Sequence, residues 1–436
     1  MNYPETLDYL YNQLPMFTRI GASAFKKDLT NTLALCERLD NPQHKFKTVH
    51  VGGTNGKGST SHMLAAVLQT AGYKTGLYTS PHLRDFRERI RINGQMISEQ
   101  EVVEFVAHHQ TDFEEIQPSF FEMTVALAFD AFVSHDVDIA IIEVGLGGRL
   151  DSTNVISPLL SIITNIGWDH MNLLGNTLPE IASEKAGIIK AETPVIIGEY
   201  QPKIAQVFLD KAAEQKAPIS FASKDWEITP INSEKAEVSN SEIALQVNRT
   251  ASTNTDYPPV INLDLTGTYQ LKNVKTVLSA IGKLRIQGFA ITNEDVTTAL
   301  RQVKTLTGLQ GRWQTLSLNP LTICDTGHNP DGIEEVLKNI EAVPYQHLHF
   351  VIGMVNDKDS SKVLSMLPKN ATYYFCKPDI PRGLDADALQ QQAAAFNLAG
   401  QTYASVPAAL QAAQQTAAPN DLVFAGGSTF VVAEIV

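Results

Sequence analysis

The run from His50 to Thr60 carries the residue types that bind phosphate. An extended segment enters a turn dense in glycine, and a helix-forming segment leaves it. Backbone N–H groups and the amino end of a helix would therefore face one place, an arrangement that binds anions. Lys57 is placed to reach the β- and γ-phosphates of a nucleotide, and a hydroxyl from Ser59 or Thr60 would lie near a bound Mg²⁺.

This loop departs from the common phosphate-binding pattern in two places. Position 51 is Val, and Gly58 follows Lys57 where Ser or Thr is usual. A glycine-rich turn between a strand and a helix, without any ligand, is the alternative interpretation.

Polar residues follow three other strand-like runs, at strand ends that face the ligand side of an α/β sheet. Glu143 ends the apolar run 137–144, and a carboxylate at such a strand tip beside a phosphate-binding loop holds Mg²⁺ in many NTPases. Ser80 follows the short run 74–79, which Pro81 ends, and His170 follows another apolar strand. The alternatives are a solvent-facing strand end, a turn residue and a histidine with an ordinary structural role.

Two further segments have both a structural and a functional interpretation. From Arg87 to Ile92 charged and apolar residues alternate, which predicts a strand that is either a solvated edge or a cationic wall near an anionic substrate. Ser119 and Glu122 have capping-box spacing at the start of a helix that runs to about Val133.

Composition places these motifs in a globular protein of more than one domain. The chain has 436 residues and 43% apolar content, which favours two domains. Its net charge of −13 argues against nucleic acid or an anionic membrane as a partner. The 3 cysteines are far apart, and the amino end lacks a basic region followed by an apolar run, so we expect a cytoplasmic protein.

Alternating strands and helices predict an α/β fold divided at a short linker, 306–312. We expect residues 1–308 to form a P-loop NTPase-like, ATP-binding domain with a mostly parallel sheet. Residues 309–436 are expected to form a smaller Rossmann-like domain, with strands at 321–324, 347–353, 372–375 and 422–425.

Several strings, in order, resemble one family over nearly the whole chain. Gly-Thr-Asn-Gly-Lys-Gly-Ser from Gly53, Phe-Glu-Met-Thr from Phe121 and Gly-Gly-Arg-Leu-Asp from Gly147 are three of them. The others are Asp169-His170, Glu-Lys-Ala-Gly-Ile from Glu184, and Asp325-Thr-Gly-His-Asn-Pro. Together they resemble the folylpolyglutamate synthase and dihydrofolate synthase family, a branch of the Mur-type amide ligases.

The resemblance implies an ATP-dependent ligase that joins L-glutamate to a pteridine-bearing carboxylic acid through an acyl phosphate, acting as a monomer. It implies two Mg²⁺ sites, held by Ser80, Glu143 and His170, with Lys185 carbamylated to support the second. Catalysis would rest on Lys57, Glu143, His170 and Lys185. The implied ATP contacts are Thr54, Asn55, Gly56, Lys57, Gly58, Ser59, Thr60, Asn273, Arg312, Asp325 and His328, and the implied pterin contacts are Phe121, Glu122, Thr124, Arg149 and Asp151.

One position departs from the family pattern. Tyr269 stands where the family's Gly-x-His-Gln-x-x-Asn string has His, so only Asn273 is carried over from that string. Residues 353–359 and 426–428, at two further strand ends, are expected to line the glutamate side.

The alternatives differ in substrate and in class. The substrate that accepts glutamate could be dihydropteroate, a folate monoglutamate, or either one, since the family resemblance allows all three. The intact Gly147–Asp151 string favours a protein that uses both substrates. A peptidoglycan Mur ligase would need a further domain before its loop. A nucleotide switch would need a base-reading Asn/Thr-Lys-x-Asp, whereas 356–359 has different spacing. A relative that binds without catalysis is disfavoured by the intact Lys57, Glu143 and His170.

Overall fold

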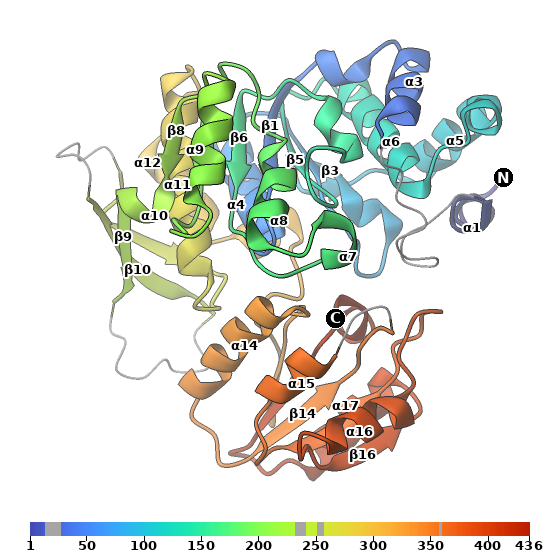
Figure 1. Cartoon of the computed structure of the whole chain (residues 1–436), viewed down its shortest axis with the longest axis vertical. Coiled ribbons are helices and arrows are strands. Elements are labelled where there is room, and N and C mark those ends of the chain that lie inside the picture. Colours follow the sequence, from blue (N-terminus) through green and yellow to red (C-terminus); the bar gives the residue numbers. More distant parts are fainter. Residues whose placement is uncertain (14–27, 232–240, 251–256, 357–359) are drawn as a thin grey trace. The chain divides into compact units, whose positions relative to one another are not determined.

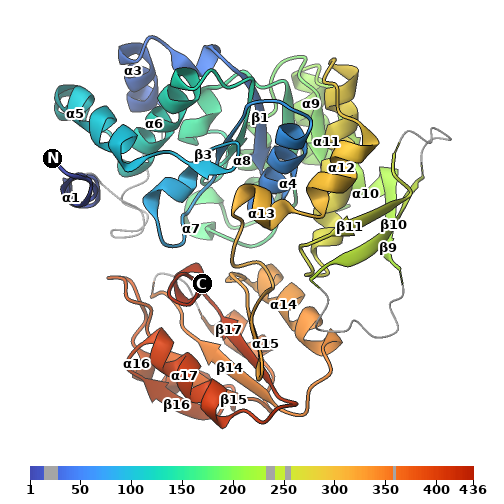
Figure 2. The ribbon, with the colours of Figure 1, turned by 180° about the vertical axis from the view of Figure 1, so that it is seen from behind.

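The computed structural model describes residues 1–13, 28–231, 241–250, 257–356 and 360–436. Its contacts divide the chain into two compact units (Figures 1 and 2). The N-terminal unit comprises 1–231, 244–264 and 270–308, and the C-terminal unit comprises 232–243, 265–269 and 309–436. No helix in these described ranges is long and apolar enough to span a membrane.

The N-terminal unit is built on an eight-stranded sheet in the order β4-β3-β2-β5-β1-β6-β7-β8. From β2 to β8 in that order, neighbouring strands pair in parallel, whereas β3 pairs antiparallel with β2 and β4 pairs antiparallel with β3. Their bounds are β1 Lys47–Gly52, β2 Thr75–Tyr78, β3 Ile90–Ile92, β4 Gln95–Met96, β5 Ile139–Glu143, β6 Leu160–Ile163, β7 Val195–Ile197 and β8 Ile219–Phe221. Parallel strands end at the same edge of a sheet, so the residues after β1, β2, β5, β6 and β7 gather there.

Helices cover both faces of this sheet (Figures 1 and 2). On one face lie α4 (Lys57–Thr70), α11 (Gln270–Ile286) and α12 (Asn293–Leu300), and on the other α6 (Phe120–Ser134), α8 (Leu178–Ala186) and α9 (Ala205–Glu214). Because both faces are covered, β5 is buried along its whole length, and β1 is buried except at Lys47. The remaining helices are α1 Tyr3–Gln13, α3 Thr30–Arg38, α5 Glu99–Ile116, α7 Met171–Leu174, α10 Ala222–Asp225 and α13 Val303–Thr307, with 3₁₀ turns η2 Pro42–His44, η3 Phe86–Arg89 and η4 Ser152–Val155.

A small sheet, β11-β10-β9, lies beside this layered core. Its strands are β9 Trp226–Pro230, β10 Ile243–Arg249 and β11 Val260–Leu263, and β9 pairs antiparallel with β10. The Trp226 indole donates a hydrogen bond to the Ser279 hydroxyl at 2.9 Å, which joins β9 to α11.

The C-terminal unit is a second, smaller α/β sandwich with strand order β12-β13-β17-β14-β15-β16. Side chains of β14 and β17 alternate between two cores: Phe350 and Phe424 pack on one face, and Val351 and Val423 on the other. The strands are β12 Gln314–Leu318, β13 Leu321–Cys324, β14 Leu348–Ile352, β15 Thr372–Cys376, β16 Gly400–Tyr403 and β17 Leu422–Gly426. The helices are α14 Pro330–Ala342, α15 Ser361–Met366, α16 Ala386–Ala394, α17 Val406–Thr416 and α18 Thr429–Ala433.

These two units confirm the predicted α/β class with largely parallel sheets. One local prediction is wrong: the alternating segment from Arg87 is a strand only over Ile90–Ile92, because Phe86–Arg89 forms a 3₁₀ turn. The Asp85 side chain accepts from the Arg87 amide, and Glu88 accepts from the Asp85 amide, a capping box that holds the turn.

Candidate active site

The phosphate-binding loop has the predicted order of strand, turn and helix. β1 ends at Gly52, and α4 begins at Lys57 after Gly56, whose φ of 85° favours glycine. The first hydrogen bond of the helix runs from the Thr60 amide to the Gly56 carbonyl at 2.9 Å. The amides of the first turn before Thr60 therefore have no acceptor within the helix, which suits an anion at this end.

Inside the loop, several polar groups already have partners. The Lys57 ammonium donates to the Thr54 carbonyl at 3.1 Å. The amides of Thr54 and Asn55 donate to Asn165, each at 2.9 Å, so the helix end rather than these two amides is left to face a phosphate. The Thr60 hydroxyl is buried and makes no hydrogen bond with any described residue.

Two of the predicted metal ligands lie next to each other. β2 and β5 are neighbouring parallel strands, and Ser80 and Glu143 lie at their carboxyl ends. The Ser80 amide donates to the Glu143 carboxylate at 3.3 Å, and Glu143 is only 5% exposed. The carboxylate of Glu143 and the hydroxyl of the neighbouring residue Ser80 are oxygen ligands, which Mg²⁺ prefers.

His170, the third predicted ligand, is the N-cap residue just before α7 and has a φ of 49°. Its ring lies 3.7 Å from the Asp169 carboxylate, and its amide donates to the same side chain at 3.0 Å. Across the described ranges, no group of at least three His, Cys, Asp and Glu side chains is arranged to hold a metal ion. Mg²⁺ commonly binds one or two protein carboxylates together with phosphates and water, a ligand set that Glu143 and Ser80 fit.

Lys185 lies near the end of α8 and reaches the phosphate-binding loop. Its ammonium donates to the Gly53 carbonyl at 3.0 Å, and the residue is 5% exposed. Burial, followed by the charge of Lys57, lowers the pKa of Lys185 to about 7. Part of the Lys185 population is therefore a neutral amine near neutral pH.

The glycine-rich turn after β5 brings three of the predicted strings together. A Cβ at Gly145 would lie 2.2 Å from the Phe121 ring, and one at Gly148 would lie 2.8 Å from the Glu184 carbonyl. A Cβ at Gly187 would meet Arg149 at 2.4 Å. The three glycines allow the start of α6, this turn and the end of α8 to touch.

Most polar groups predicted to contact a pterin already make local hydrogen bonds. Glu122 accepts from the Ser119 amide at 2.6 Å in the predicted capping box, and Thr124 donates to the Phe120 carbonyl at 2.6 Å. Arg149 donates to Glu184 at 2.9 Å.

Of the residues predicted to contact a pterin, Asp151 accepts several hydrogen bonds from its own turn. Its carboxylate accepts from the Leu146 amide at 2.8 Å, the Thr153 amide at 3.0 Å and the Thr153 hydroxyl at 2.5 Å. These bonds support the shape of the glycine-rich turn, and pterin contact by these residues stays a prediction.

The first turn of α11 also lies against the loop. The Gln270 side chain donates to the Ser59 hydroxyl at 3.1 Å, and a Cβ at Gly56 would lie 2.3 Å from the Asn273 side-chain oxygen. Asn273 in turn donates to Gln270 at 2.7 Å. The predicted nucleotide residue Asn273 is thus next to the loop.

In the C-terminal unit, Asp325 is the centre of a separate polar cluster. Its carboxylate accepts from the Tyr269 hydroxyl at 2.5 Å, the Trp313 amide at 2.7 Å and the Gly327 amide at 2.8 Å. Burial raises the pKa of Asp325, although these bonds and the charge of Arg312 oppose the shift. Tyr269, whose role was open from the sequence, is therefore the side-chain partner of Asp325.

His328 lies beyond this cluster, and its ring lies 3.0 Å from the Thr326 carbonyl. As expected, residues 353–356 follow the end of β14, and residues 426–428 begin at the last residue of β17. Residues 357–359 lie outside the described residues.

Asn165 and Glu199 are site residues that the sequence reasoning missed. Each is a polar residue within two positions of the end of an apolar strand, β6 or β7. The same strand-end signal that indicated Glu143 could have found them.

Two family models match the chain. The Mur ligase middle domain matches residues 51–281, and the Mur ligase glutamate ligase domain matches residues 311–429.

Curated relatives match over most or all of this chain. The dihydrofolate synthase/folylpolyglutamate synthase of Bacillus subtilis is 31% identical over 99% of this chain and 98% of its own length. The enzyme of the same name from Escherichia coli is 33% identical over 88% of this chain and 85% of its own. A probable bifunctional folylpolyglutamate synthase/dihydropteroate synthase of Haloferax volcanii is 32% identical, and this chain spans about half (50%) of its length.

Solved structures show the same fold. Escherichia coli FolC in complex with DHPP and ADP has a TM-score of 0.85 and 29% identity, over 100% of this chain and 97% of that chain. A bifunctional folylpolyglutamate synthase/dihydrofolate synthase from Yersinia pestis, complexed with AMPPNP and Mn, has a TM-score of 0.82 and 28% identity, over 100% and 97% of the two chains.

Proposed function

The chain belongs to the folylpolyglutamate synthase/dihydrofolate synthase family of the Mur ligases, and we propose that it is an ATP-dependent ligase that adds L-glutamate to dihydropteroate, to reduced folates, or to both. The observation that carries this proposal is the assembly around one phosphate-binding loop. Lys57 begins α4, Lys185 bonds to Gly53, and Asn273 lies against Gly56. The family membership supplies the substrate class.

The chemistry requires positive charge at this loop. A carboxylate is a poor electrophile until it is phosphorylated, and phosphorylation brings two anions together. Lys57 and the first-turn amides of α4 bind and orient the phosphates and offset their charge. The carboxylate oxygen attacks the γ-phosphorus, the bond to ADP breaks, and the glutamate amine then displaces phosphate from the acyl carbon.

We assign the first divalent cation to Ser80 and Glu143, and a second to His170 with Lys185. When bound, the cations neutralise charge that develops on the phosphoryl oxygens. Mn in related structures supports the use of a divalent metal.

Carbamylation of Lys185 is part of this proposal. The neutral amine attacks CO₂, an N–C bond forms, and the amine gives up a proton to water. The product is an anionic carboxylate on a side chain that was a cation. A pKa of about 7 and burial beside the Gly53 carbonyl support the reaction, because only the neutral amine is a nucleophile.

The remaining assignments follow the residue positions. Phe121, beside Gly145, is the candidate platform for the flat pteridine ring, with Glu122, Thr124, Arg149 and Asp151 around it. In the C-terminal unit, which matches the glutamate ligase domain, Arg312, Asp325 and His328 are the candidate nucleotide contacts. We further propose that the protein is a monomer and that it is cytoplasmic. The buried free cysteines Cys36, Cys324 and Cys376 support the second proposal, because thiols stay reduced in that compartment.

The test is glutamate-dependent ADP release with ATP and Mg²⁺, run in parallel on dihydropteroate and on tetrahydrofolate, with products identified by mass. ADP release with both substrates would establish a bifunctional synthase. ADP release with only one of them would show which of the two reactions the protein catalyses. Absence of ADP release with both substrates would overturn the folate proposal and favour another Mur-type amino-acid ligase. Other amino acids and carboxylic acids would then be tested as substrates.

A further inference from the structure

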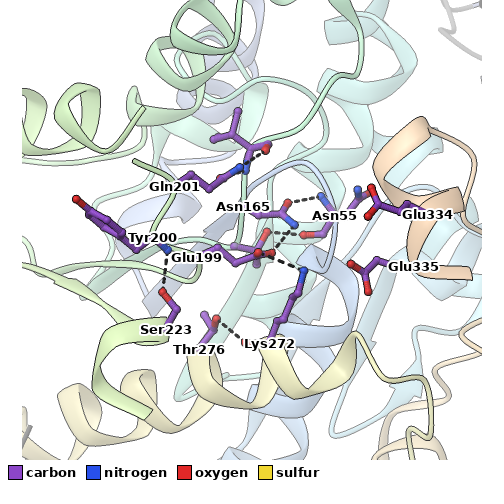
Figure 3. Close-up of polar contacts among 12 residues, drawn as sticks. Asn55, Asn165, Glu199, Tyr200, Gln201, Ser223, Lys272, Thr276, Glu334 and Glu335 are labelled. Atoms are coloured by element: carbon purple, nitrogen blue, oxygen red, sulfur yellow. Dashed lines mark hydrogen bonds and ion pairs between the residues drawn. The ribbon is translucent and has the colours of Figure 1, made fainter. Parts of the chain in front are cut away.

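A chain of polar side chains joins the ends of three neighbouring strands beside the phosphate-binding loop (Figure 3). β1 leads into the loop, Asn165 follows β6, and Glu199 follows β7. None of the family strings in the sequence includes Glu199.

Asn165 holds the backbone of the loop at two successive residues. Its carbonyl oxygen accepts from the Thr54 amide, and its side-chain oxygen accepts from the Asn55 amide, each at 2.9 Å. The neighbouring Thr164 hydroxyl donates to the Asn55 carbonyl at 2.6 Å. Both the N–H and the C=O of Asn55 are therefore held by residues that follow β6.

Glu199 in turn holds Asn165. One oxygen of its carboxylate accepts from the Asn165 side-chain amide at 2.9 Å, and the other lies 3.3 Å from the Lys272 ammonium. Lys272 belongs to the first turn of α11, the turn that contacts Ser59 and Gly56 through Gln270 and Asn273. Glu199 thus joins the loop and α11, the two elements around the candidate phosphate site.

The acceptor character of Glu199 determines which way the Asn165 amide faces. An ionised carboxylate accepts hydrogen bonds only, whereas a side-chain amide has one accepting end and one donating end. With its NH₂ end toward Glu199, Asn165 must present its oxygen to the Asn55 amide. If the amide turned over, its NH₂ group would meet the Asn55 N–H, and two donors would oppose each other.

We propose that Asn165 and Glu199 are a positioning pair, which sets the loop at Asn55 for nucleotide binding through the polarity of their hydrogen bond. The inference rests on the proposed binding of ATP by this loop. The pair is expected to affect nucleotide affinity, because Asn165 contacts the loop and Glu199 contacts α11 through Lys272.

The polarity can be reversed by design. Asn165→Asp places a carboxylate against Glu199, so two acceptors oppose each other, and we expect the Kd for ADP to rise by at least about tenfold. Glu199→Gln nearly preserves shape but lets either amide turn over, and we expect a smaller rise, of about threefold or more. In the double variant the introduced aspartate accepts from Asn55, and the introduced glutamine donates to it and can still accept from Lys272.

We therefore expect the double variant to bind ADP within about threefold of the unsubstituted protein, better than Asn165→Asp alone. The measurements are ADP binding by calorimetry and the KM values for ATP, glutamate and the pterin substrate. The KM for ATP should follow the Kd for ADP, while the other KM values and the thermal midpoint change little. Asp112→Asn, which alters an exposed ion pair with Arg38 in the same unit, serves as the matched control.

Single variants that bind ADP as the unsubstituted protein does would overturn the inference while leaving the proposed function intact. A double variant no better than Asn165→Asp would overturn the polarity argument in the same way. Absence of ADP binding by the unsubstituted protein would overturn the inference and the proposed function together.

Discussion

The Lys185 ammonium donates a hydrogen bond to the Gly53 carbonyl at 3.0 Å, so the end of α8 reaches the first glycine of the phosphate-binding loop after β1. These residues are far apart in the chain and are brought together because α8 packs in one core with β6 and β7, and β6 pairs with β1. The contact puts a buried amine of lowered pKa next to Lys57, and this leads to the first prediction.

Activity should depend on CO₂ through Lys185. Because the pKa of Lys185 is about 7, the amine is increasingly protonated below this pH and cannot react with CO₂, so activity should fall on the acid side. CO₂-depleted buffer should lower activity, and bicarbonate should restore it. Glutamate-dependent ADP release across pH, with and without bicarbonate, and the mass of the intact protein are the measurements.

The matched control for this lysine is Lys190, which is half-buried, also has a lowered pKa and donates to a backbone carbonyl, that of Asn154, at 2.8 Å. Lys185→Ala should lose at least about 100-fold in kcat and recover in part with added acetate, whereas Lys190→Met should keep its bicarbonate response. A protein of unmodified mass with full activity in bicarbonate would exclude the carbamate.

Lys185 also contributes a pH dependence to stability. The unfolded chain binds a proton at this side chain up to about pH 10.5, and the unmodified folded protein only up to about pH 7. Stability of the unmodified protein should therefore rise as pH increases through this window, and Lys185→Met should flatten that slope. Urea denaturation at several pH values in CO₂-free buffer measures it, and an unchanged slope would contradict the lowered pKa.

Lys57→Ala should abolish ligation while the protein remains folded. The ammonium lies at the start of α4, where phosphate charge must be offset, so we expect a loss of at least about 100-fold in ADP release. Lys45→Met, which alters an exposed ion pair with Asp40, should have no effect. Full ADP release by Lys57→Ala would show that the loop does not bind the reacting phosphates.

Glu143→Gln should weaken the response to Mg²⁺. The carboxylate is buried beside Ser80, and the neutral amide is a poorer ligand, so the Mg²⁺ concentration for half-maximal activity should rise at least about tenfold. Activity is measured against Mg²⁺ at saturating ATP. An unchanged Mg²⁺ requirement would remove Glu143 from the metal site.

Tyr269→Phe should destabilise the C-terminal unit, because it removes a donor to the buried carboxylate of Asp325. Hydrogen bonds to charged groups contribute about 1.5–3 kcal/mol, and those to neutral groups about 0.5–1.5 kcal/mol. Tyr373→Phe, which loses a bond to the Pro368 carbonyl in the same unit, should therefore cost less. Hydrogen exchange of β13 compares the two, and equal losses would show that the Asp325 bond is not charge-assisted.

Local patterns predicted most of the fold and the first part of the site. Apolar runs with a polar residue at the end located β5 with Glu143, and the glycine-dense turn before a helix-forming segment located the loop. Capping-box spacing at Ser119 and Glu122 was confirmed by the hydrogen bonds at the start of α6. Each of these features depends on residues that are close together in the sequence, so a local sequence pattern is enough to predict it.

Two strands of the C-terminal unit, β12 and β16, were not predicted. Both lie at the edges of the sheet, where a strand is only partly buried and its apolar pattern is weak.

The sequence by itself therefore determined the α/β class, the phosphate-binding loop and the family. Only the tertiary structure decided that Asp325 is bonded to Tyr269 and that Glu199 reaches the loop through Asn165. Each of these contacts depends on where strands and loops meet in space and on which end of a polar group faces its neighbour. Spacing along the chain carries no information about either, because packing of distant segments sets both.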